Sequence, residues 1–317
     1  MVFRITMEKS KALRRMFMEK RNDGCLQLGT FLIGLIFFSI VITTTLYFFT
    51  ITVTPVNLAV AICCSSFVCF VSSRNIKKTV LITIVGILIL VGTIVVCEHT
   101  FDFSWDGNTY HKTMTAFMKN GWNPLKVTFY DYAASNIPSC SVLSQTWLDA
   151  YPKGAEIFAA CIYTITGNIE GGKCFNILSC IAVCFVSCGF LGETTSLKRG
   201  QKIICSILFG LNPVVFSQFF TYYIDGLLWQ FFLLCIFCLM YLTLCENGRL
   251  ITYCYYILFI WLCQLVKKKK SIKLLDCNFV VFDQTLMVHY LEHYLLVLDC
   301  LLVLLFVQKM EYFEYLD

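Results

Sequence analysis

Long stretches without a charged side chain are the feature that most restricts the fold of this chain. A bilayer core about 30 Å thick is crossed by about 20 apolar residues in a helix. Seven windows near that length contain no Asp, Glu, Lys or Arg: 26–50, 56–73, 79–97, 174–191, 203–223, 227–245 and 250–266. Two further candidates are 155–166, which is shorter, and 286–307, which carries acids and histidines.

The sequence therefore predicts an all-α fold, a polytopic transmembrane helix bundle with about seven to nine membrane segments and one long external loop. We expect helices because lipid offers no hydrogen-bond partner to the open edge of a sheet. The composition agrees, since 58% of the residues are hydrophobic and only 14% are charged. A soluble domain could not bury that much apolar surface.

Basic residues gather ahead of the first apolar window and indicate its orientation. They are Lys9, Lys11, Arg14, Arg15, Lys20 and Arg21. Lys and Arg near a span stay on the cytoplasmic side, so we expect residues 1–24 to be a cytoplasmic N-terminus of a protein in a bacterial plasma (inner) membrane. The net charge of +5 then reflects topology and not a nucleic-acid site.

The same rule places the segment after the third window outside. Residues 98–152 form the external loop of a transmembrane domain that we assign to residues 25–266. Window 155–166 either crosses the membrane or is re-entrant. The re-entrant alternative keeps the basic cluster at 198–202 inside and brings 222–226 to the face of the long loop, but it leaves the lysine run 267–270 outside. The sequence leaves both topologies open.

The C-terminal tail, residues 267–317, differs in composition from the rest of the chain. It begins with the lysine run and then mixes acids and histidines into apolar stretches. We hypothesise a reading-frame slip in the A-rich lysine codons, which would make residues from about 267 onward non-native. Resequencing the gene across these codons tests the idea, and an intact frame would reject it.

Two acids at the start of the external loop are the strongest candidates for chemistry. Asp102 and Asp106 stand four residues apart in the segment FDFSWDGNTYH, which ends at His111. A carboxylate at the membrane–water boundary is partly desolvated and can act as a base or a cation ligand. The alternative is an ordinary interfacial loop in which Trp105 and Tyr110 lie at the headgroups and the acids are solvated.

Further polar residues define the rest of the expected site. Residues 108–120 are predicted to form an amphipathic helix that ends at the GWNP turn, and Lys153 follows at a second turn. Asn212-Pro213 interrupts window 203–223, and Tyr222 and Asp225 come after it. Asp225 could also be a helix N-cap, and Lys153 could extend to the headgroups.

The cysteines do not indicate a metal centre. Most of the 19 lie inside apolar windows, where a small thiol packs between helices. Cys235 and Cys238 form a lone CxxC without a second pair or a nearby histidine, so we assign no metal. No glycine-rich phosphate loop or dinucleotide fingerprint is present, and no cofactor is indicated beyond a divalent cation that the acids could hold.

The order of these motifs resembles the membrane glycosyltransferases of the GT-C fold, such as protein mannosyltransferases and aminoarabinose transferases. The segments that carry the resemblance are FDFSWDGNTYH, GWNP, YPKGAEIFAACIYTITGN and NPVVFSQFFTYYIDG, within residues 79–245. It departs from the family in having two windows before the acidic loop and acids that are not in a tight DxD.

The resemblance implies transfer of a sugar from a polyprenyl-phosphate donor to a lipid or surface glycan acceptor. Asp102 or Asp106 would take the proton of the acceptor hydroxyl, while Lys153 or His111 would balance the phosphate charge. Tyr222 and Asp225 would line the substrate site. With a frame slip, the polypeptide would be an inactive fragment of a transferase.

Two other functions stay open from the sequence. A transporter or flippase of lipid-linked saccharides would also place polar groups in broken helices, but it predicts charges within the membrane or an internal repeat. A non-catalytic membrane subunit would suit the small mass outside the membrane.

Overall fold

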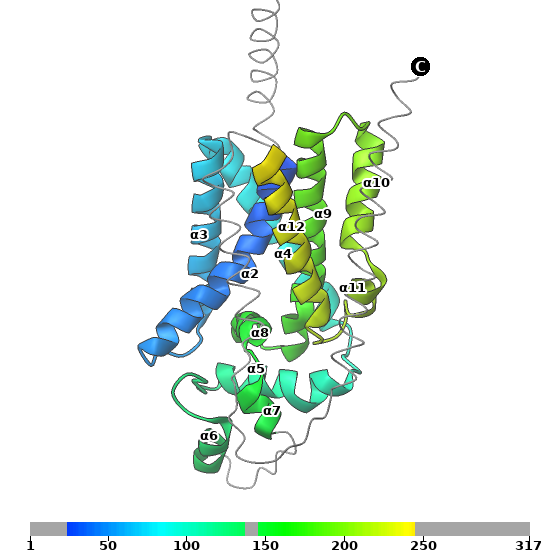
Figure 1. The fold of residues 1–317 in the computed structure, drawn as a ribbon. Helices are drawn as coiled ribbons and strands as arrows, with labels where there is room; N and C mark the ends of the chain where they lie inside the picture. Colours follow the sequence, from blue (N-terminus) through cyan, green and yellow to red (C-terminus); the bar gives the residue numbers. More distant parts are fainter. Residues whose placement is uncertain (1–23, 137–144, 245–317) are drawn as a thin grey trace, which may run out of the picture.

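The computed structural model describes residues 24–136 and 145–244, and every regular element in these ranges is helical. The helical class expected from the sequence is confirmed for this part of the chain. Figure 1 shows long helices side by side in a bundle, with shorter helices beneath one end of it. Windows 250–266 and 286–307 and the tail 267–317 lie outside the described residues.

Four helices in the described ranges are long and apolar enough to cross a membrane. They are α2 (Gly24–Phe48), α3 (Pro55–Ser73), α4 (Ile76–Glu98) and α9 (Phe175–Thr194), which continues the 3-10 helix η3 (Ile169–Cys174). They match four of the predicted windows and indicate an integral membrane protein. The count of seven to nine segments remains a prediction.

Helices α2 and α9 lie at the centre of the bundle, whereas much of α3 and α4 is exposed. Glycines let the backbones approach closely: a Cβ on Gly29 would meet Val186 at 2.7 Å, and one on Gly189 would meet Leu26 at 2.7 Å. Small residues at such crossings are typical of membrane helices. The exposed side chains of α3 and α4 are large and apolar, as lipid contact requires: Val56, Val60, Phe67, Val80, Leu81, Ile84, Leu88, Val91, Val95 and Val96.

Window 203–223 is not one continuous helix. It divides into α10 (Arg199–Gly210) and α11 (Pro213–Ser217), and α12 (Asp225–Leu244) follows after a turn. The break lies at Asn212, whose side-chain oxygen accepts the Val215 N–H at 2.9 Å and caps α11. Pro213 lacks an N–H, so it suits the first turn of a new helix and not the interior of a long one.

The shorter helices form a layer at one end of the bundle (Figure 1). They are η2 (Gly107–His111), α5 (Lys112–Lys119), α6 (Phe129–Asn136), α7 (Gln145–Ala150) and α8 (Gly154–Thr166). Helix α8 has 13 residues. A helix of that length spans about 20 Å, less than the hydrocarbon core of about 30 Å. Its length favours the re-entrant alternative for window 155–166.

The amphipathic helix expected at 108–120 is present as η2 and α5, and its apolar side packs on protein. Met114 and Met118 are fully buried, and α5 contacts α8. The helix ends at the predicted turn, where Gly121 has a φ of +105°. The Trp122 N–H donates to the Phe117 carbonyl at 2.9 Å and the Gly121 N–H to that of Met118 at 3.2 Å, which is a Schellman motif.

Candidate functional site

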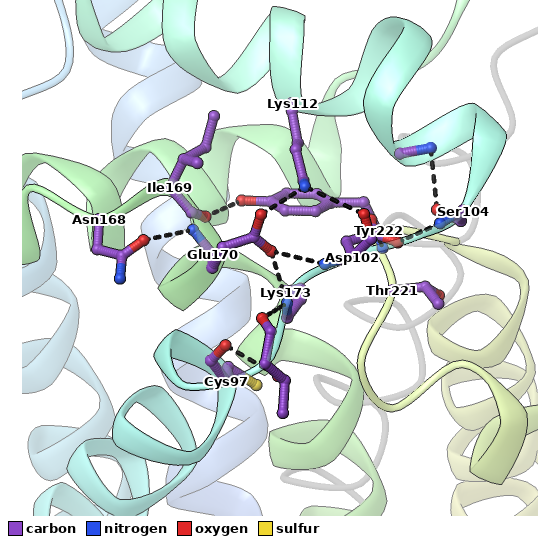
Figure 2. Close-up of polar contacts among 12 residues, drawn as sticks. Cys97, Asp102, Ser104, Lys112, Asn168, Ile169, Glu170, Lys173, Thr221 and Tyr222 are labelled. Carbon is purple, nitrogen blue, oxygen red and sulfur yellow. Dashed lines mark hydrogen bonds and ion pairs between the residues drawn. The ribbon is translucent and has the colours of Figure 1, made fainter.

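Asp102 joins the segment after α4 to the turn between α11 and α12. Its side chain is fully buried. One carboxylate oxygen accepts the Ser104 N–H at 2.8 Å and the other accepts the Tyr222 N–H at 2.9 Å. Figure 2 shows these residues converging from separate segments of the chain. The acidic loop and the broken helix, which the sequence analysis treated as two candidate regions, therefore lie together.

Space around the Asp102 carboxylate is filled. A Cβ built on Gly107 would lie 2.0 Å from Asp102 Oδ2 and 2.4 Å from Ser104 Oγ. The Gly107 N–H donates to that Ser104 oxygen at 3.1 Å, so Ser104 closes the loop over the carboxylate. Both Asp102 oxygens thus have backbone donors.

A buried ionic cluster lies next to Asp102. Glu170, on η3, pairs with Lys112 Nζ at 2.5 Å and with Lys173 Nζ at 2.6 Å. Its Oε2 atom also accepts the Asp102 N–H at 3.2 Å. Lys173 is fully buried and donates to the Thr100 carbonyl as well. Both ammonium groups therefore contact the Glu170 carboxylate, whereas Asp102 joins the cluster through its backbone N–H and carbonyl.

Further hydrogen bonds connect this cluster to the surrounding segments. Lys112 Nζ reaches Asn108 Oδ1 at 3.0 Å, and the Asn108 amide donates to the Asp102 carbonyl at 2.7 Å. The Tyr222 hydroxyl donates to the Ile169 carbonyl (Figure 2). Residues 100–112, η3 and the 218–224 turn are consequently held as one unit at the end of α4.

Asp106 differs from Asp102 because it is only half-buried. It stands directly before η2, a π-helical turn, and such turns are frequent at functional sites. Burial, followed by hydrogen bonds with Asp106 and Tyr151, raises the pKa of the Tyr110 phenol above its ordinary value. The phenol stays protonated and can donate to the Asp106 carboxylate.

A third carboxylate, Asp225, lies near the other two. Burial, and then the charges of Asp106, Asp102 and Asp225, raise the pKa of the Tyr223 phenol. All three acids therefore act on one tyrosine, although more than one hundred residues separate Asp225 from the others along the chain. Asp225 is half-buried, begins α12 and accepts the Gln218 amide at 3.3 Å.

Asn176 on α9 holds the turn that carries Tyr222 and Tyr223. Its side-chain amide donates to the carbonyls of Gln218 and Thr221 at 3.1 Å each and of Tyr223 at 2.9 Å. The freed carbonyls of the broken helix are thus satisfied by a neighbouring helix, as membrane burial requires.

His111 lies in a buried pair with Glu156. Its Nδ1 atom is 2.5 Å from Glu156 Oε1, and both side chains are almost completely buried. We had expected His111 to balance a phosphate charge. Its pairing with Glu156 joins η2 to α8, and a role toward a phosphate stays a prediction.

Lys153 precedes α8, where its ammonium donates to the carbonyls of Asp149 and Tyr151. It also lies over the Trp122 ring, 5.9 Å from the ring centre. The lysines that pair with a carboxylate of the cluster are Lys112 and Lys173, which the sequence analysis did not select.

The sequence carried a partial signal for these missed residues. Glu170 and Lys173 are three apart in a short polar break between two apolar windows, which is the spacing of a helical ion pair. Nothing local marks Lys112 as the second partner. Among residues 24–136 and 145–244, no three His, Cys, Asp or Glu side chains gather as a metal site would require.

Comparison with known proteins gives no relative for this chain. No family model, no curated protein and no solved structure matches it.

Proposed function

We propose that this protein is a membrane glycosyltransferase that uses a polyprenyl-phosphate sugar and acts at the end of α4. The observation that supports it is the 2.9 Å hydrogen bond from the Tyr222 N–H to Asp102, which joins the acidic loop to the turn before Asp225. Two half-buried carboxylates, Asp106 and Asp225, are thereby held near the membrane boundary. A lipid-linked donor would present its phosphate at that depth.

The surroundings of the two loop acids favour different roles. Asp102 has both oxygens hydrogen-bonded to backbone N–H groups and is a positioning residue. Asp106 is half-buried, and we assign it the role of general base. The acceptor hydroxyl gives its proton to Asp106 as its oxygen bonds to the anomeric carbon, and the sugar–phosphate bond breaks to leave polyprenyl phosphate.

The finer expectations from the sequence belong to this proposal. The chain would cross a bacterial plasma membrane seven to nine times with a cytoplasmic N-terminus, so that the layer beneath the bundle faces outward. A divalent cation held by the loop acids, Asp102 and Asp106, would offset the charge of the leaving phosphate. Lipid and a glycan acceptor would be its partners.

The test is release of polyprenyl phosphate from polyprenyl-phosphate hexoses by the full chain in liposomes that contain envelope glycolipids. Asp106→Asn should lower the rate at least about 100-fold, the usual contribution of a general base. Asp131→Asn, at an exposed acid on α6, is the matched control and should leave the rate unchanged. An unaltered rate in Asp106→Asn, or no release by the unmodified chain, would reject the proposal.

A further inference from the structure

Aromatic rings gather beside the proposed base. Tyr110 on η2 lies 5.0 Å from the Tyr151 ring and 6.5 Å from the Trp147 ring, measured between ring centres. Trp147 and Tyr151 are 5.6 Å apart. The Trp147 and Tyr110 rings are nearly parallel, with 21° between their planes. Helix α7 and the residue after it thus build an aromatic surface against η2.

Trp147 is the exposed member of this cluster. It is 53% exposed, whereas Tyr110 is 4% exposed. The indole lies nearly parallel to the Tyr110 ring, and about half of Trp147 remains exposed at 53%. An indole open to water loses the favourable burial that its size allows, so a ligand that covers it gains free energy.

The membrane does not account for this exposed indole. In Figure 1, α7 lies on the far side of α5 from the bundle of long helices. Tryptophans that anchor a protein at the headgroups lie instead at the ends of membrane helices. A ligand of this surface would therefore approach from the side away from the long helices.

The cluster is continuous with Asp106. Asp106 directly precedes η2, the short helix that carries Tyr110, so the half-buried carboxylate borders the aromatic surface. A ligand on the Trp147 face would lie beside polar groups that can bind hydroxyls. Flat apolar rings bordered by a few polar groups are typical of small-molecule sites.

We propose that Trp147, Tyr110 and Tyr151 form a binding surface for a pyranose ring of the acceptor saccharide. The C–H face of the sugar lies on the indole, and its hydroxyls meet the polar groups near Asp106. The assignment to the acceptor rests on the proposed function, because the lipid-linked donor reaches the site from the bilayer.

Saccharide binding to the full chain in detergent micelles tests this proposal by saturation-transfer NMR. The probes are neutral gluco-, manno- and chito-oligosaccharides, with open-chain alditols as the ligands that lack a flat ring. We expect at least one oligosaccharide to bind and the alditols not to bind. Trp147→Ala should weaken binding about tenfold, and Trp147→Phe should retain most of it because a ring face remains. Tyr130→Ala, at a 60% exposed ring on α6, is the control and should bind normally.

Each result bears on the proposal separately from the transferase assay. Saccharide binding that depends on Trp147, with no sugar transfer by the unmodified chain, would keep the surface and reject the proposed function. Sugar transfer by the unmodified chain, without any saccharide binding that depends on Trp147, would keep the proposed function and reject the surface. If no oligosaccharide binds, or if Trp147 instead mediates self-association of the chain, the saccharide surface is wrong.

Discussion

Replacing Glu170 with Gln should destabilise the protein more than any single exposed substitution. The change removes the partner of two ammonium groups, Lys112 at 2.5 Å and Lys173 at 2.6 Å. The side chain of Lys173 is fully buried, so water cannot take over the role of the carboxylate there. The amide keeps the shape of the side chain, and the effect therefore reports charge.

The magnitude follows from the burial of the cluster. Removing one partner of a buried ion pair costs about 3–5 kcal/mol, because the remaining charge stays desolvated. Exposed pairs contribute only about 0–1 kcal/mol. Since the side chains of Lys173 and Lys112 are 0% and 11% exposed, we expect Glu170→Gln to lie in the buried range.

Unfolding of the full chain in detergent, followed by tryptophan fluorescence, measures this loss. Lys126→Gln, at an exposed loop position, is the control and should change the free energy of unfolding by less than about 0.5 kcal/mol. Adding Lys112→Met and Lys173→Met to Glu170→Gln should restore much of the stability, because apolar groups of similar volume replace buried charges well. Wild-type stability in the single variant, or no recovery in the triple variant, would refute the reasoning.

Three other substitutions test the packing, ionisation and hydrogen bonds of the site. Gly107→Ala should cost about 1–3 kcal/mol of unfolding free energy in the same assay, because its Cβ would meet Asp102 Oδ2 at 2.0 Å, whereas Gly92→Ala, which meets nothing within 4 Å, should not destabilise. In an alkaline absorbance titration, Tyr110→Phe should remove a phenol that ionises well above pH 10. Because folding raises the pKa of Tyr110, the contribution of this phenol to stability is complete below pH 10 and is lost as the pH rises further. A phenol that titrates normally near pH 10 would contradict the assignment. Asn176→Asp should make the turn accessible to protease, since an ionised carboxylate cannot donate to its three carbonyl partners, and unchanged proteolysis would show that they do not hold the turn.

The membrane helices were predictable because their signal is local. Windows 56–73 and 79–97 differ from α3 (Pro55–Ser73) and α4 (Ile76–Glu98) by no more than three residues at either end. An apolar segment long enough to cross the bilayer must form a helix whatever its neighbours are. Window 203–223 is equally apolar and free of charged residues, and only the Asn212-Pro213 pair within it indicated that the helix breaks there.

The partners inside the site could not be predicted, because they depend on tertiary contacts. Glu170 and Lys112 are 58 residues apart, and no spacing rule connects positions so distant in the chain. Likewise, His111 follows the loop acids closely in sequence, but it pairs with Glu156 on α8, and no local pattern indicated that partner. Residue type alone therefore did not predict which side chains pair in the folded chain.

Asp102 and Asp106 show why an acidic motif alone does not identify a base. Both precede aromatic or glycine residues in one short loop, and nothing in the sequence ranks them. In the structure, two backbone N–H groups occupy the Asp102 oxygens, while Asp106 is only half-buried. On the proposed function, substituting either acid should lower activity, Asp102 by moving the loop and Asp106 by removing the proton acceptor. An activity assay by itself would therefore assign both as catalytic, and only a parallel measurement of stability separates the residue that holds the site from the one that acts in it.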